Sequence, residues 1–70
     1  MRFRLLADLC EDGDCPKVYE YKPDADYVAL QGYRLSDDEL AELGEIPPGE
    51  IVIKFPRALV THIPTEVREA

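Results

Sequence analysis

The sequence predicts a small α+β domain with a mainly antiparallel sheet of four strands, in the order β-β-β-α-β, and a short C-terminal helix. Three runs rich in β-branched and aromatic residues come first, a strong helix-start signal follows them, and an alternating apolar run comes after the helix. Seventy residues allow one domain. We expect that domain over 1–64 and a C-terminal tail over 65–70.

The first strand is expected at 3–9, where apolar residues alternate imperfectly. Strict alternation would place four of them on one face: Phe3, Leu5, Ala7 and Leu9. The segment 10–16 is a turn by composition, because it combines Gly13 with several aspartates and ends in a proline.

The next two strands are expected at 17–21 and 27–33. Pro23 followed by Asp24 suits the two central positions of a type I turn, so the strands should pair as a hairpin. Gly32 inside the second run indicates a bulge or a close approach of another backbone segment.

Four tyrosines would share one face of this hairpin if Tyr21 pairs with Tyr27. A face of this kind is apolar but carries hydroxyl groups at its edge, as many protein interfaces do. Two interpretations stay open: either the face is the core beneath the helix, or it points outward and binds a partner, most simply a second copy of the chain. The candidate interface residues are Tyr19, Tyr21, Tyr27 and Tyr33.

The helix is the best-specified element and should run from Ser36 to Gly44. Ser36 and Glu39 have the spacing of a capping box, and Leu35 and Leu40 that of a hydrophobic staple. Gly44 supplies the C-terminal stop. Two turns are too short to be stable alone, so we expect the helix to pack on the sheet.

The last strand is expected at 50–55, where apolar and other residues alternate. Pro56 suits the first position of a further short helix over 57–62, which Pro64 should end.

The core of such a chain must be thin. Surface scaling gives about 11,600 Å² for the unfolded chain and about 4,500 Å² for a compact folded one. The apolar burial that this allows is about equal to the entropic cost of ordering the chain. A disulfide, a metal ion or a dimer interface is therefore expected to add stability.

The charge excludes several kinds of partner. Fifteen acidic and eight basic residues give a net charge of -7, and the basic residues are scattered, so we expect no nucleic-acid binding. A basic protein partner fits better. No apolar run approaches a membrane span, and the first residues turn acidic before a signal-peptide core could form. We therefore expect a cytoplasmic protein that does not enter membranes.

Cys10 and Cys15 are the only cysteines. Free thiols, a disulfide across the turn, a zinc site and a redox switch all stay open. Zinc would need two further ligands, from His62, from nearby carboxylates or from a second copy of the chain.

Other sites find no support in the residue pattern. The calcium-loop template laid from Asp8 places Tyr19 where a bidentate glutamate is required, so an acidic solvated turn is expected instead. Ser36 is needed for the helix cap, and His62 lacks a motif that would make it catalytic with a cysteine or a carboxylate. We expect no enzymatic activity and no cofactor, zinc being the alternative.

The chain resembles a group of small uncharacterised actinobacterial proteins that often accompany helix-turn-helix regulators. The similarity covers nearly the whole chain, and the resemblance implies a regulatory accessory role without an assigned activity. It is carried by residues 8–10, Cys15-Pro16 leading into Val18-Tyr19, 28–33 ending in Gln31-Gly32-Tyr33, and Pro48-Gly49-Glu50.

These observations lead to two functional hypotheses. The first is protein association, in which the chain dimerises through a sheet face or edge and presents an acidic surface to a basic or regulatory partner. The alternative is a zinc-binding or thiol-redox module centred on Cys10 and Cys15.

Overall fold

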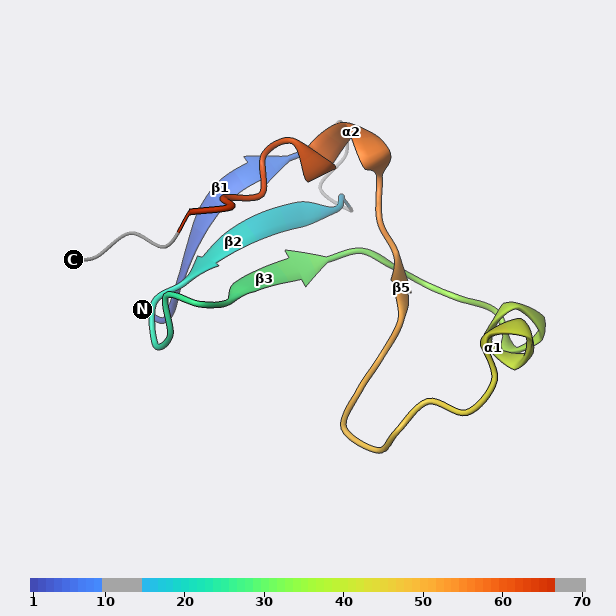
Figure 1. Cartoon of the computed structure of the whole chain (residues 1–70). Helices are drawn as coiled ribbons and strands as arrows, with labels where there is room; N and C mark the ends of the chain where they lie inside the picture. Colours follow the sequence, from blue (N-terminus) through green and yellow to red (C-terminus); the bar gives the residue numbers. More distant parts are fainter. Residues whose placement is uncertain (10–14, 67–70) are drawn as a thin grey trace.

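A computed structural model describes residues 1–9 and 15–66 of the chain. It confirms the α+β class, but its strands form two sheets instead of one (Figure 1). The larger is antiparallel, in the order β1-β2-β3, and the smaller pairs β4 with β5. The elements are β1 (Phe3–Asp8), β2 (Lys17–Tyr21), β3 (Val28–Gln31), β4 (Tyr33–Arg34), α1 (Asp37–Leu43), β5 (Ile53–Lys54) and α2 (Arg57–Val60).

A β-bulge interrupts the pairing of β1 with β2. Leu5 lies opposite Tyr19, but Ala7 lies opposite Val18, so Leu6 is an extra residue on β1. The bulge places Ala7 on the face of Val18 and leaves Leu5 on the other. Strict alternation along the first strand is therefore wrong from this point onward.

The hairpin of β2 and β3 has the predicted register, with Tyr19 opposite Ala29. The connection turns at Lys22-Pro23 and again at Ala25-Asp26, and the centre of this second turn lies two residues beyond the expected one. The Asp26 N–H donates to the Asp24 carboxylate at 2.9 Å, and the Tyr27 N–H donates to the Asp24 carbonyl at 3.1 Å. Asp24 thus opens the turn, because its short side chain can accept a hydrogen bond from the backbone two residues on.

Gly32 divides the third predicted strand. A Cβ at Gly32 would lie 2.7 Å from the Lys54 carbonyl oxygen and 2.9 Å from Cδ1 of Ile53. Glycine is required because β5 crosses the chain at this point, which confirms the predicted close approach of backbone. Beyond Gly32 the chain pairs with β5, where Tyr33 lies opposite Lys54. The single four-stranded sheet is therefore replaced by sheets of three and two strands.

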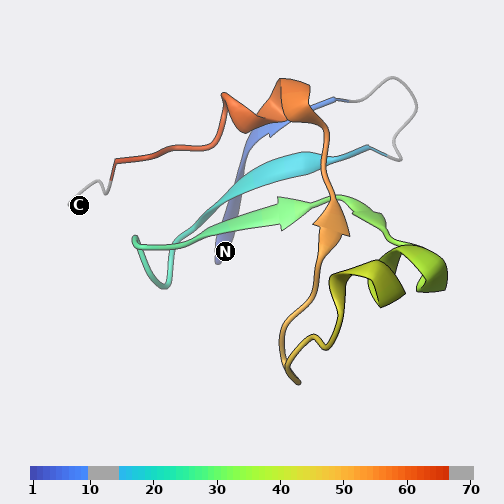
Figure 2. The same cartoon turned by 45° about the vertical axis from the view of Figure 1, so that its right-hand side comes forward.

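The core lies between α2 and one face of the three-stranded sheet. Figures 1 and 2 show α2 and the segment after it running over β1 and β2. Val18 is 0% exposed and Leu59, on α2, is 3% exposed. Within the described part of the chain, the other buried residues are Cys15 and Pro16, just before β2. The covered face is therefore the face that carries Val18.

The segment 33–54, here called the arm, projects beyond the β3 edge of the sheet (Figures 1 and 2). Every residue of α1 is described, and none of them is buried. Leu40 is half-buried, whereas Leu43 is exposed. The expectation that this helix packs on the sheet is wrong. The radius of gyration of 13.8 Å reflects the projection, since about 11 Å is typical of a compact chain of this length.

Candidate interaction surface

The uncovered face of the three-stranded sheet is apolar and partly aromatic, and we call it the aromatic face. Cross-strand pairing places five side chains on it: Phe3, Leu5, Tyr19, Tyr21 and Ala29. The Phe3 ring meets the Tyr19 ring edge-on, with centroids 6.0 Å apart, and lies 5.7 Å from the Tyr21 ring. These contacts fix the rings in place. Phe3 nevertheless remains 45% exposed and Leu5 48% exposed.

The four predicted interface tyrosines do not share one surface. Tyr19 and Tyr21 lie on the aromatic face, half-buried. Tyr27 lies just before β3 and is exposed, and Tyr33 belongs to β4, where Nζ of Lys54 lies 5.8 Å from its ring centroid. The break at Gly32 removes Tyr33 from the expected face.

Two members of the aromatic face were not predicted as interface residues. Phe3 lies opposite Tyr21 and Leu5 opposite Tyr19. The signal that could have identified them is the alternation at the start of the first strand, combined with the pairing of that strand with the second. That pairing joins residues far apart in the sequence, so the residue pattern of the first strand alone does not reveal it.

The arm holds an open groove of about 610 Å³ between α1 and the segment that returns to β5. Leu40 contributes from the helix, and Ile51, which is 83% exposed, contributes from the returning segment. The further lining residues are Arg34, Leu35, Asp37, Ile46, Pro47, Pro48, Gly49, Glu50, Val52 and Ile53. The groove is apolar along much of its length and has charged residues among its lining.

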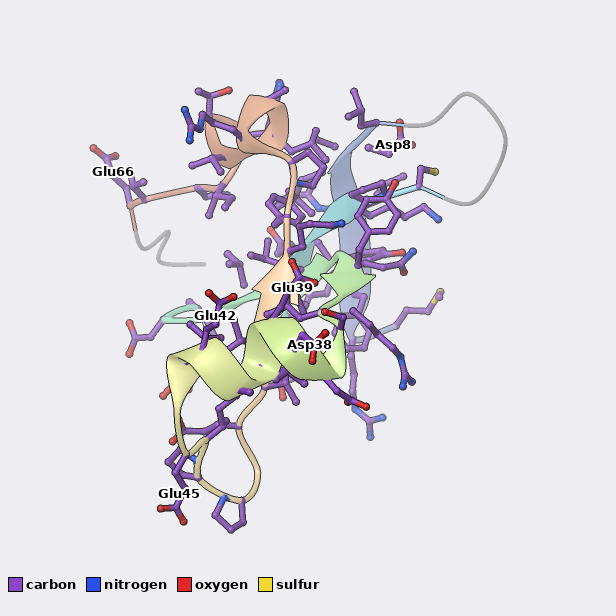
Figure 3. All side chains as sticks on the ribbon, turned by 90° about the vertical axis from the view of Figure 1, so that its right-hand side faces the viewer. Asp8, Asp38, Glu39, Glu42, Glu45 and Glu66 are labelled. Carbon is purple, nitrogen blue, oxygen red and sulfur yellow. The ribbon has the colours of Figure 1, made fainter. Side chains whose placement is uncertain are left out.

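The arm is strongly acidic, with six acidic and two basic residues and a net charge of -4. Figure 3 shows Asp38, Glu39 and Glu42 on α1 and Glu45 just beyond it, far from Asp8 and Glu66. The acidic residues of the first turn of α1 suit the positive end of the helix dipole, while its last turn has no basic residue.

A complete capping box begins α1, as predicted. The Ser36 N–H donates to the Glu39 carboxylate at 2.9 Å, and the Glu39 N–H donates to the Ser36 hydroxyl oxygen at 3.2 Å. The backbone hydrogen bond from Ser36 is the main reason that the pKa of Glu39 is lowered, and the Ser36 hydroxyl acts in the same direction. The helix is thus started by local chemistry and not by burial.

The cysteine site is described only in part, because Cys10 lies outside the described residues, as do Glu11, Asp12 and Asp14 of the acidic turn. Cys15 is described, buried and disulfide-bonded. Its carbonyl oxygen accepts a hydrogen bond of 3.1 Å from Nε2 of Gln31 on β3. His62 is exposed in the turn after α2.

Within residues 1–9 and 15–66, no cluster of three or more histidine, cysteine, aspartate or glutamate side chains could hold a metal ion. Over the same ranges, neither helix has the length and apolar character needed to cross a membrane.

The chain as a whole exposes 6,210 Å² of surface. A compact protein of this mass would expose about 4,500 Å². The projecting arm and the uncovered aromatic face both contribute to this excess of about 1,700 Å².

Comparisons of the chain with protein-family models, with curated proteins and with solved structures found no match.

Proposed function

We propose that the protein is a small acidic association module that works as a homodimer and presents its acidic surface to a basic or regulatory protein partner. One observation carries the proposal. The chain exposes 6,210 Å², well above the roughly 4,500 Å² of a compact monomer. The exposed surface includes large apolar side chains such as Phe3, Leu5 and Ile51, and exposed apolar patches are typical of surfaces that are covered in an assembly.

The aromatic face is the surface we assign to dimerisation. Its tyrosines and phenylalanine are held by mutual ring contacts, so ordering them on binding costs little entropy. Aromatic side chains are enriched at interfaces and dominate binding energy there.

The acidic arm is the surface we assign to the basic partner. A net charge of -4 within 22 residues would attract a positively charged protein and speed its association. The resemblance to proteins that accompany helix-turn-helix regulators supports a regulatory partner. We place this role in the cytoplasm.

Sedimentation equilibrium of the wild-type chain and of Tyr19→Lys tests the proposal. We expect the wild type to sediment as a dimer and Tyr19→Lys to dissociate at least about tenfold more readily, because a lysine would be buried at the interface. Leu5→Lys repeats the test at a more exposed position, in case Tyr19→Lys disturbs the fold. The matched control is Val60→Lys, since Val60 lies on α2, over the opposite face of the sheet, and is 50% exposed.

Two results would overturn this assignment. A wild-type chain that stays monomeric at every concentration tested removes the dimer. Tyr19→Lys and Leu5→Lys variants that remain folded and dimerise as well as Val60→Lys remove the aromatic face from the interface.

A second candidate function is a thiol-disulfide switch, and it is favoured by the disulfide at Cys15. In a reducing compartment such a bond is opened unless its potential is low. A sulfur atom in a disulfide is not a thiolate, so the zinc alternative requires the bond to be reduced first.

Native mass spectrometry with and without reductant and chelator separates these functions. A dimer that survives reduction and chelation supports association. A dimer that is lost on reduction supports the switch, and one that is lost only with chelator supports zinc.

A further inference from the structure

We infer that the aromatic face of one copy is covered by the arm of a second copy, and that the exchange is reciprocal. The inference rests on the proposed homodimer and names what occupies its interface. The arm and the aromatic face both carry exposed apolar side chains, among them Ile51 on the arm and Leu5 on the face. Both belong to the same chain, so two copies related by a two-fold axis would each place their arm on the aromatic face of the other.

The exposed area fits this arrangement. Two chains together expose about 3,400 Å² more than two compact monomers would. Obligate homodimers bury about 2,000–5,000 Å² in total, whereas weak encounters bury less than about 1,200 Å². The excess is thus of the size that a permanent dimer covers.

The arm lacks the burial that a helix of its length requires. α1 has seven residues, and isolated helices this short are not stable in water. Its Leu43 is 54% exposed, and Ile51 across the groove is more exposed still. Packing on a second chain would supply the contacts that its own sheet does not.

The arm of one copy could be covered by the aromatic face or by the arm of a second copy, and charge favours the aromatic face. Two arms in contact would bring together net charges of -4 each, which is unfavourable. The aromatic face consists of uncharged side chains, and Lys17 at its end lies opposite Asp8 as well as Gln31, so the face carries no net charge. An acidic apolar arm therefore fits the aromatic face better than it fits another arm.

The labelled acids in Figure 3 agree with this assignment. Asp38 and Glu42 lie one helical turn apart on α1, with Glu45 beyond them at the tip of the molecule. These charges need to stay in water, so the parts of the arm that enter the interface are its exposed apolar side chains, among them Leu43 and Ile51.

Ile51→Glu tests the inference, because it changes the arm and leaves the aromatic face intact. We expect this variant to fold normally and to dimerise at least about tenfold more weakly than the wild type. Val60→Glu is the matched control: Val60 is 50% exposed on α2, which covers the opposite face of the sheet. That control should dimerise like the wild type.

Mixing two defective variants gives the sharper result. In a reciprocal exchange, the Leu5→Lys variant has an unchanged arm and the Ile51→Glu variant has an unchanged aromatic face. In a mixed dimer, one of the two contacts between arm and face is therefore unaltered. We expect the mixture to form heterodimers at concentrations where each variant alone is monomeric, as detected by native mass spectrometry with one chain isotope-labelled.

The outcomes separate this inference from the proposed function. A monomeric wild type overturns both. A dimeric wild type, with Ile51→Glu as dimeric as Val60→Glu, keeps the dimer but overturns the arm exchange, and it points to direct contact between two aromatic faces. Failure of the mixture to form heterodimers also overturns the exchange.

Discussion

The three-stranded sheet and the arm stabilise their secondary structure in different ways. In the sheet, Val18 is buried on β2 and Leu59 on α2, which runs over the sheet, and β1, β2 and β3 pair in order with one bulge in β1. In the arm, a complete capping box starts a helix of which no residue is buried, all seven being described. The sheet depends on burial, and the arm depends on local hydrogen bonds.

This difference indicates which part of the chain is complete by itself. The sheet with α2 has a small core of its own. The arm has a defined helix start, a groove and exposed apolar residues, but no core. The capping box specifies the helix of the arm, but the rest of the same chain does not bury that helix. We therefore assign the arm to an interface.

The largest contrast between the two regions is expected from a matched pair of leucine truncations. Leu59→Ala should lower the free energy of unfolding by about 2–5 kcal/mol, because Leu59 is buried in the core. Leu43→Ala should change it by at most about 0.5 kcal/mol in a dilute, monomeric sample. Urea denaturation measures both. Equal losses would show that the arm shares the core of the sheet.

A smaller effect is expected at the point where the two regions meet. Gly32→Ala would place a Cβ 2.7 Å from the Lys54 carbonyl oxygen, and backbone cannot move aside easily. We expect a loss of about 1–3 kcal/mol. The amide resonances of β4 and β5 should shift while those of β1 stay in place. Shifts spread evenly over the chain would mean that the crossing is not a local junction.

The helix cap should affect the arm alone. Ser36→Ala removes the hydroxyl that accepts from the Glu39 N–H and should destabilise α1 by about 1 kcal/mol. Hydrogen exchange should become faster for α1 amides and remain unchanged for amides of β2. If β2 amides lose protection equally, the arm and the sheet unfold as one unit.

The smallest effect is the pH dependence of the cap. Because the folded-state pKa of Glu39 is lowered, its stabilising effect is complete above the pKa of an unfolded glutamate. The effect is lost as the pH falls through the lowered pKa. The Ser36 amide resonance should follow this titration, and Glu39→Gln should abolish it. A Glu39 midpoint at or above the ordinary value for glutamate would contradict the assignment.

Local features of the fold were predictable from the sequence, and non-local features were not. Ser36 and Glu39 identified the helix start because the capping box involves neighbours only. Gly32 indicated the close approach of another segment, although not that Lys54 supplies it. The bulge at Leu6 depends on pairing with another strand, so the pattern of the first strand alone missed it.

The same contrast between local and non-local features holds for the candidate interaction surface. Tyr19 and Tyr21 were assigned to one face by the hairpin register, which nearby residues determine. Tyr33 was placed there wrongly because the third strand was taken to continue through Gly32. The sequence left open which helix covers which face, since that choice depends on the path of the chain between 44 and 56.

Hydrogen exchange of the α1 amides at low and high protein concentration is the most direct test of the central claim. If the arm of one copy is held on the aromatic face of another, protection of α1 should rise with protein concentration as the dimer forms, and Ile51→Glu should remove that rise. Protection of α1 that does not change between a monomeric and a concentrated sample would contradict the claim that a second copy covers the arm.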